Sequence, residues 1–250
     1  MSIKLKTLLE QGKVAFGSWI TIPHTDVSEM LSLAGFDWLL FDLEHSPYEV
    51  YHLEMMISSV KNDVSCLARV PDNQQFLIKR ALDTGIDGVM VPLVSSKEDA
   101  ILAVKSARYP PNGIRGVGPR RASFYGLKRE EYFDRADEIM VIIQIETRKA
   151  VNNIEEILSV DGVSAFFIGP NDLSFSLGYR NWRNDEVKDT IRRLAKIGRK
   201  LGVPGGMYCS STELLQFALE NELQLLALGS DYRFLMKGAL LTLEKARELI

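Results

Sequence analysis

Two acidic residues each follow an apolar stretch of the sequence. Glu146 closes the β-branched run 141–145, and Asp172 follows the run 165–168 and a Gly-Pro pair. One helix-length segment, 149–160, separates them, so the unit reads strand–helix–strand and its two strands are expected to be parallel. Both carboxylates would then lie at one sheet edge, where they could hold a divalent cation such as Mg²⁺, Mn²⁺ or Co²⁺. Each acid taken alone could instead cap the helix that follows it.

The second and third apolar runs also end on polar side chains. Asp42, Glu44 and His45 end one of them, and Arg69 ends the other. The planar guanidinium of Arg69 could bind a carboxylate or an oxyanion. Histidine exchanges protons near neutral pH, so His45 is the candidate acid/base, with Asp42 or Glu44 holding its tautomer. The structural alternatives are a capping or solvated His45 and an Arg69 that pairs only with Glu44.

A third polar side chain supports the predicted metal site. Gln144 lies two residues before Glu146, on the same face of the strand, and could orient that ligand. The predicted strands contain no lysine, which disfavours Schiff-base chemistry. A 2-oxo acid that chelates a cation through its carboxylate and keto oxygens becomes acidic at the adjacent carbon. These residues therefore predict enolate chemistry beside a divalent cation.

Apolar runs and amphipathic segments alternate along the whole chain. The runs predict strands at 16–22, 38–44, 66–70, 88–94, 140–146, 165–169, 205–209 and 225–229. The segments with three- and four-residue apolar spacing predict helices at 27–34, 48–60, 74–84, 97–107, 150–159, 185–200, 212–221 and 232–249. Eight such units in 250 residues favour a single (β/α)₈ TIM barrel over 1–250, an α/β fold. The alternative, a doubly wound sheet, seldom has eight regular units, and its Gly-x-Gly-x-x-Gly turn is missing.

One connection is much longer than the others. Residues 109–137 form a Gly- and Arg-rich insertion that contains Arg115, Arg120, Arg121 and Tyr125. Long loops in compact domains are often functional, so we expect a wall or lid over the site, with a surface insertion as the alternative.

Composition excludes several classes of partner. The net charge is −3 with acids and bases interspersed, so no basic stripe is available for a nucleic acid. No run of about 18 apolar residues and no secretion leader is present, which predicts a cytoplasmic protein without a membrane span. Cys66 and Cys209 lack metal-site or redox spacing and are expected to stay free thiols.

Several motifs together carry a resemblance to a known family. They are GFDW at 35–38, EH at 44–45, ARYPP at 107–111, GIRGVG at 113–118, QIET at 144–147 and IGPNDLS at 168–174. In this combination the chain resembles the HpcH/HpaI family of metal-dependent, class II pyruvate aldolases over nearly its whole length. The resemblance implies a (β/α)₈ barrel that reversibly cleaves 4-hydroxy-2-oxo acids into pyruvate and an aldehyde.

The resemblance also implies roles for individual residues. Glu146 and Asp172 would bind the metal, Arg69 would stabilise the pyruvate enolate, and His45 would move protons through water. The family pairs its histidine with a carboxylate that corresponds to Asp83, which precedes the fourth strand at the opposite face of its own barrel. Asp83 could therefore reach only the histidine of a neighbouring subunit.

An oligomer follows from that pairing. The family forms hexamers, and the last helix, 232–249, is expected to be exchanged between subunits. Gln144 and Asn171 are expected to contact substrate, together with Arg69 and Asp172. Asn171 and the segment 207–209 depart from the family pattern, which leaves the aldehyde partner open.

Two other functions fit parts of this pattern. One is a related metal-enolate enzyme, such as a malyl- or citryl-coenzyme A lyase or an oxaloacetate decarboxylase. Coenzyme A would need a basic groove, for which only the insertion 109–137 offers arginines. The other is a non-catalytic barrel that binds a sugar acid.

Overall fold

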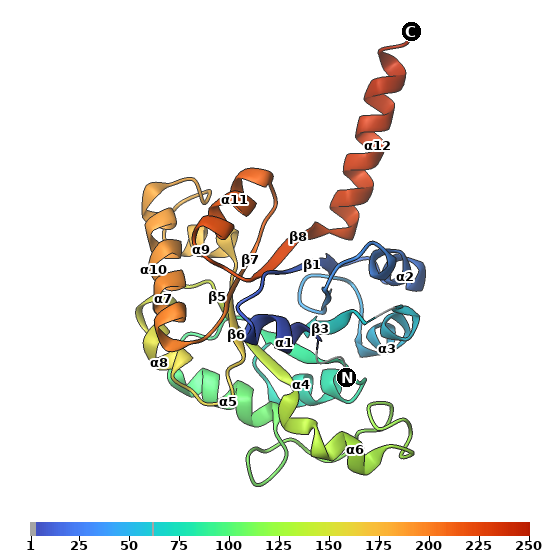
Figure 1. Cartoon of the computed structure of the whole chain (residues 1–250), viewed down its shortest axis with the longest axis vertical. Coiled ribbons are helices and arrows are strands. Elements are labelled where there is room, and N and C mark those ends of the chain that lie inside the picture. The colour runs from blue at the N-terminus through green and yellow to red at the C-terminus, as the bar shows by residue number, and fades with distance from the viewer. Residues whose placement is uncertain (1–3, 62) are drawn as a thin grey trace.

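Eight parallel strands close into a barrel (Figure 1). The structure is a computed structural model that describes residues 4–61 and 63–250. Each strand pairs with the next and β8 pairs with β1, in the order β1 (Ala15–Ile20), β2 (Trp38–Asp42), β3 (Ser65–Arg69), β4 (Gly88–Val91), β5 (Met140–Ile145), β6 (Ala165–Ile168), β7 (Gly205–Tyr208) and β8 (Leu225–Ser230). The predicted (β/α)₈ barrel is confirmed, and the doubly wound alternative is wrong.

Helices surround the barrel and connect its strands. They are α1 (Lys4–Glu10), α2 (Thr25–Leu33), α3 (Val50–Ser59), α4 (Gln75–Leu82), α5 (Lys97–Ala107), α6 (Arg129–Asp134), α7 (Arg148–Asn152), α8 (Ile154–Leu158), α9 (Pro170–Ser176), α10 (Asp185–Leu201), α11 (Thr212–Glu220) and α12 (Asp231–Arg247), with a 3₁₀ turn η1 at Ala136–Glu138. The helix predicted at 150–159 is divided at Asn153, and the short helices α1 and α9 were not predicted. None of the helices in the described ranges is long and apolar enough to cross a membrane.

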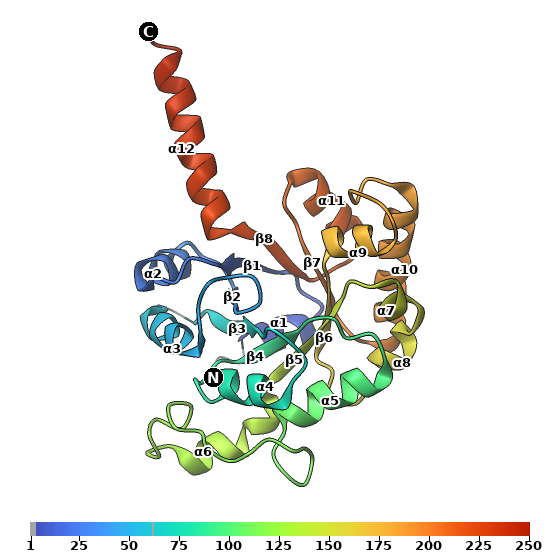
Figure 2. The same ribbon diagram turned by 180° about the vertical axis from the view of Figure 1, so that it is seen from behind.

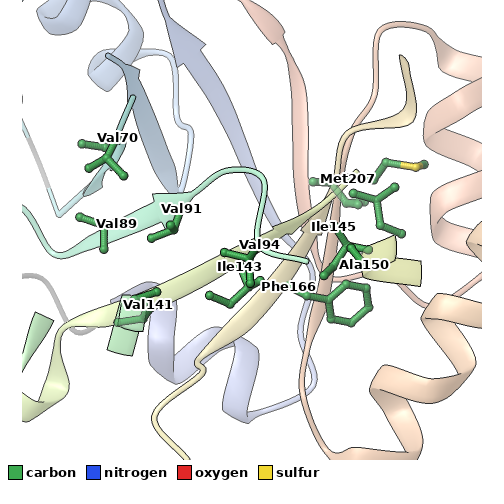
Figure 3. Packing of buried hydrophobic residues seen from close by; sticks show 14 of the residues in the cluster. Val70, Val89, Val91, Val94, Val141, Ile143, Ile145, Ala150, Phe166 and Met207 are labelled. Atoms are coloured by element: carbon green, nitrogen blue, oxygen red, sulfur yellow. The ribbon is translucent and has the colours of Figure 1, made fainter. Parts of the chain in front are cut away.

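Successive side chains along each strand point alternately outward and inward, so the strands contribute to two apolar layers. Side chains that point outward, among them Val89, Val91 and Ile143, pack beneath the helices (Figure 3). Side chains that point inward, such as Leu40 and Phe167, fill the barrel. The barrel is therefore a packed core, and polar chemistry is confined to its ends.

The first helix, α1, closes the end of the barrel at which the strands begin. Leu5 and Leu9 of α1 are buried in the inner cluster with Trp38. The Trp38 indole donates to the Ala15 carbonyl oxygen at 3.2 Å and lies against Gly17. A Cβ on Gly17 would stand 2.1 Å from the indole, so only glycine leaves room for this side chain.

The insertion 109–137 does not cover the catalytic end of its own barrel. It follows α5 and precedes β5, so it leaves from the end where strands begin. Arg121 donates to the Thr84 carbonyl oxygen at 2.6 Å, and Arg115 pairs with Asp83 at 2.7 Å, both just beyond α4. The expected wall or lid over the site of the same chain is therefore wrong, because a loop after a helix emerges at the opposite end from one after a strand.

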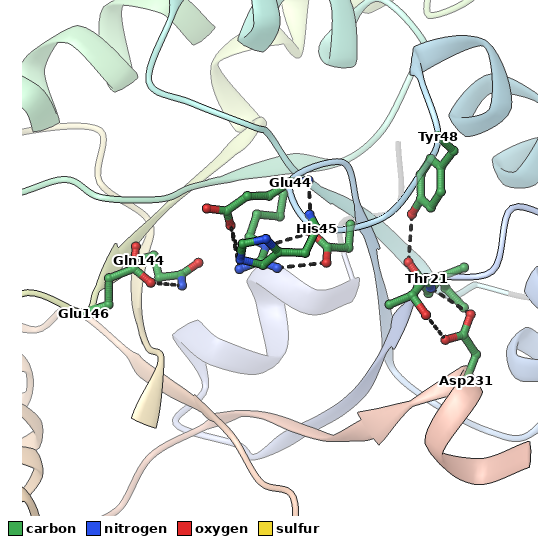
Figure 4. Close-up of polar contacts among 10 residues, drawn as sticks. Thr21, Glu44, His45, Tyr48, Gln144, Glu146 and Asp231 are labelled. Atoms are coloured by element: carbon green, nitrogen blue, oxygen red, sulfur yellow. Dashed lines mark hydrogen bonds and ion pairs between the residues drawn. The ribbon is translucent and has the colours of Figure 1, made fainter. Parts of the chain in front are cut away.

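The last helix projects away from the barrel. In both views α12 extends from the end of β8 into open space, and α6 lies at the other end of the long axis (Figures 1 and 2). Among the described residues of α12, only Asp231 is buried. Its carboxylate accepts hydrogen bonds from the backbone N–H of Thr21 and of Ile22, both at 2.7 Å, and from the Thr21 hydroxyl at 2.6 Å (Figure 4). One buried acid thus fixes the first turn of α12 to the end of β1.

Candidate active site

The two predicted metal ligands meet beside Gly169. Glu146 follows β5, where one oxygen accepts from the Leu93 N–H at 2.7 Å and the other from the Gln144 amide (Figure 4). A Cβ built on Gly169 would stand 3.2 Å from Asp172 Oδ2 and 3.4 Å from Glu146 Oε2. The two carboxylates therefore approach the same small space, which a side chain at position 169 would fill.

Helix capping does not account for either acid. Thr147, and not Glu146, is the N-cap of α7, and its hydroxyl accepts from the Ala150 N–H at 3.0 Å. Asp172 lies in the first turn of α9, whose N-cap is Gly169. Each acid keeps a carboxylate oxygen directed at the space between them.

The electrostatics of this space suit a cation. Glu146 is 5% exposed and makes no ion pair with a basic side chain among the described residues. Burial raises the pKa of Glu146 above its usual value, and the nearby charges of Asp172 and Glu44 raise it further. A hard divalent cation would relieve this repulsion through oxygen ligands. No cluster of three or more acidic, histidine or cysteine ligands exists in residues 4–61 and 63–250, so further ligands would be other oxygens.

Arg69 is held rigidly opposite these acids. The register of β2 and β3 sets Asp42 directly across from Arg69, and two hydrogen bonds of 2.8 Å join their side chains. Glu44 lies 2.6 Å from a third guanidinium nitrogen, and the guanidinium lies 4.2 Å from the Trp19 ring centroid. Burial raises the pKa of Glu44, although Arg69 opposes this. The predicted anion-binding arginine therefore has one fixed orientation.

His45 lies at the open mouth of the site. Its side chain is 69% exposed, and Nε2 is 3.8 Å from Glu44. Asp42 accepts from the backbone N–H of His45 at 3.4 Å and not from the imidazole, so of the two expected tautomer partners only Glu44 approaches the ring. Asp83 is far from both, at the end of α4, where it pairs with Arg115.

A cavity of about 510 Å³ unites most of these residues. Asp42, His45, Arg69, Gln144, Asn171 and Asp172 were predicted and line it. Tyr208, which belongs to the segment 207–209 that departs from the family pattern, also lines it. The ends of β1 and β8 and the start of α12 contribute residues that were not predicted, namely Trp19, Thr21, Ser230, Tyr232 and Arg233. The rule that barrel chemistry lies at strand ends, applied to all eight runs, would have found Trp19, Thr21 and Ser230, whereas Tyr232 and Arg233 lie on α12.

A second cavity is similar in size but different in kind. It measures about 520 Å³ and is lined by residues that precede strands, including Ser164 and Gln224. None of the predicted site residues lines it. Its position at the end of the barrel where strands begin argues against catalysis there, so residue chemistry rather than volume identifies the site.

Comparisons with known proteins agree with this fold. The HpcH/HpaI aldolase/citrate lyase family model matches residues 15–237. The chain is 39% identical over 242 residues to the hydroxypyruvate/pyruvate aldolase of Sagittula stellata, covering 95% of each protein. It is 36% identical over 231 residues to the 5-keto-4-deoxy-D-glucarate aldolase of Klebsiella pneumoniae, covering 91% of this chain and 90% of the relative.

A solved structure extends the likeness to the backbone. An HpcH/HpaI aldolase/citrate lyase family protein from Burkholderia cenocepacia J2315 superposes with a TM-score of 0.94 at 29% identity, over 97% of this chain and 98% of that one. Motifs, barrel and matches thus agree from one end of the chain to the other, and the protein belongs to the HpcH/HpaI aldolase/citrate lyase family.

Proposed function

We propose that the protein is a divalent-metal-dependent lyase that reversibly cleaves a 4-hydroxy-2-oxo acid into pyruvate and an aldehyde. The observation that carries this proposal is the convergence of Glu146 and Asp172 beside Gly169, at the wall of a cavity that is lined by Gly169, Asp172 and Arg69. The names of the relatives, a hydroxypyruvate/pyruvate aldolase and a 5-keto-4-deoxy-D-glucarate aldolase, support the same reaction class.

Two carboxylates would hold the cation. Glu146 and Asp172 are its ligands in this proposal, and Gln144 keeps the Glu146 carboxylate turned toward the cavity. The cation, when bound, withdraws electrons from the oxygens of the 2-oxo acid and so favours an enolate. Mg²⁺, Mn²⁺ and Co²⁺ all fit an oxygen-ligand site.

Arg69 would stabilise negative charge, and His45 would transfer protons. In the cleavage direction a base removes the proton of the C4 hydroxyl, the C3–C4 bond breaks, the aldehyde leaves and the pyruvate enolate remains. Arg69 is fixed by Asp42 and Glu44, so its guanidinium would stabilise the enolate oxygen without reorganising. His45, exposed at the mouth, would relay protons through water to and from the reacting groups.

The proposal includes an oligomer. Asp83 and His45 stand at opposite ends of one barrel, so a pair between them requires the neighbouring subunit. The exposed helix α12 is the proposed exchange element, and the hexamer implied by the family resemblance is the expected assembly. Small-molecule substrates are the only ligands that this proposal needs besides the metal.

Metal removal tests the proposal directly. Pyruvate release from 4-hydroxy-2-oxo acids should stop after thorough chelation and return when Mg²⁺, Mn²⁺ or Co²⁺ is added. Glu146→Ala should lose both turnover and metal affinity, measured by calorimetry with Mn²⁺, because it removes one of two ligands. Glu156→Ala, which removes an exposed acid of α8, is the matched control and should behave as wild type.

Other outcomes would contradict it. Activity that survives chelation, or a Glu146→Ala variant with unchanged metal affinity and turnover, would overturn the metal site and favour a non-catalytic or metal-free barrel. The same assay with coenzyme A thioesters and with oxaloacetate separates this reaction from those of a coenzyme A lyase and a decarboxylase.

A further inference from the structure

The part of the cavity not used by the proposed metal site forms one continuous arc. Around the closed barrel the order of strands is β7, β8, β1, and the ends of these three strands supply the remaining wall. The metal ligands follow β5 and β6, and Arg69 ends β3. A 2-oxo acid held between them would direct the rest of its chain toward this arc, which must therefore contact the aldehyde half of the substrate.

This arc carries one basic side chain, Arg233. It lies in the first turn of α12, two residues after the buried anchor Asp231, so its backbone is fixed relative to the cavity. Its Nε donates to the Tyr232 hydroxyl at 3.2 Å, and its guanidinium lies 6.0 Å from the ring centroid of Tyr208. Two aromatic side chains thus hold the cation at the rim of the cavity.

Arg233 differs from Arg69 in its partners. Arg69 is paired with Asp42 and Glu44, whereas Arg233 forms no ion pair with any acid in the described part of the chain. Its remaining guanidinium nitrogens are therefore available to a ligand. An uncommitted guanidinium at the edge of a substrate cavity suits a carboxylate, which it can bind through two parallel hydrogen bonds.

We propose that Arg233 is a specificity-determining residue that binds a carboxylate on the aldehyde half of the substrate. The enzyme would then prefer aldehydes that carry an anionic group over neutral aldehydes of the same length. This inference rests on the proposed aldolase function and adds the class of aldehyde, which the sequence motifs leave open.

Paired aldehydes test the inference. We would measure kcat/KM for aldol addition of pyruvate to succinate semialdehyde and to butanal, which share four carbons and differ in the carboxylate. Wild type should favour succinate semialdehyde, and Arg233→Met should lower that preference by about 10- to 100-fold, the range for losing a charge-assisted hydrogen bond. Arg233→Lys, which keeps the charge without the planar fork, should fall between them. Lys237→Met removes a charge one turn further along α12, outside this cavity, and should keep the wild-type preference.

A separate readout distinguishes the two proposals. Exchange of the pyruvate methyl protons with deuterium from solvent requires the enolate but no aldehyde. If wild type exchanges these protons but shows no preference for the anionic aldehyde, or if Arg233→Met slows both aldehydes equally, the role of Arg233 is refuted and the aldolase proposal stands. If wild type neither exchanges protons nor forms aldol products, both proposals fail together.

Discussion

At the scale of single residues, strand register decides which side chains meet. Asp42 lies three positions from His45 in sequence, which suggested that these two interact, but the β2–β3 register places it opposite Arg69. The result is a buried arginine held by two acids and one indole face. Such a group acts by being immobile, because its donors need no reorganisation as negative charge develops.

This immobility predicts the effect of a conservative substitution. Arg69→Lys keeps the charge but cannot make two parallel hydrogen bonds to Asp42, so the cation loses its fixed orientation. We expect deuterium exchange of pyruvate to slow by about 100-fold or more, comparable to losing an oxyanion donor. Arg183→Lys, at an exposed pair with Glu213, is the control and should exchange normally. Normal exchange in Arg69→Lys would mean that any nearby cation suffices.

Residue types at strand ends made half of the site predictable. The acids that follow β5 and lie in the first turn of α9 could be found because two carboxylates near one sheet edge suggest a cation. Arg233 could not be found in this way, since it lies on α12 and a lone arginine has many roles. Its place in the site follows only from the closed barrel, which brings β7, β8 and β1 around the same cavity.

At the scale of elements, the alternation of strands and helices could be predicted from the sequence, but the short helices could not. The strands are buried runs with clear bounds, whereas α1 and α9 have only seven residues each, too few to show a periodic pattern. The insertion 109–137 was placed at the wrong end of the barrel because a loop of this length was expected to be functional and so to lie over the site. Its position after α5 is the stronger signal, since connectivity alone fixes the end from which a loop emerges.

The junction between β8 and α12 offers a test at this scale. Asp231→Ala should lower the free energy of unfolding by about 2–4 kcal/mol, because the partly buried N–H groups of Thr21 and Ile22 lose their acceptor. Urea denaturation at one fixed protein concentration would measure this, since assembly also contributes to stability. Asp189→Ala, at an exposed pair with Arg192, should change it by less than about 0.5 kcal/mol. Equal stability of the two variants would show that the anchor is dispensable.

At the scale of the whole molecule, α12 presents apolar surface to solvent. The helix exposes a row of large apolar side chains, namely Phe234, Leu235, Met236, Leu240, Leu241 and Leu243. Monomeric proteins rarely expose contiguous apolar surface of this kind, whereas subunit interfaces commonly do. The proposed assembly would also bring Asp83 of one subunit to His45 of another, so the oligomer and the site would depend on each other.

Introducing charged residues into the apolar surface of α12 should therefore dissociate the proposed oligomer. We expect wild type to sediment as a multiple of its 28.2 kDa chain, and a double variant Leu240→Asp, Leu241→Asp to shift toward 28.2 kDa, because burying two new charges at an interface is unfavourable. Turnover should fall as the oligomer dissociates, since the Asp83 of the neighbouring subunit is then lost from the site. Lys245→Ala, on the same helix, removes an exposed charge and should leave the mass unchanged. A wild-type chain that sediments at 28.2 kDa while fully active would refute the exchanged helix and the shared site together.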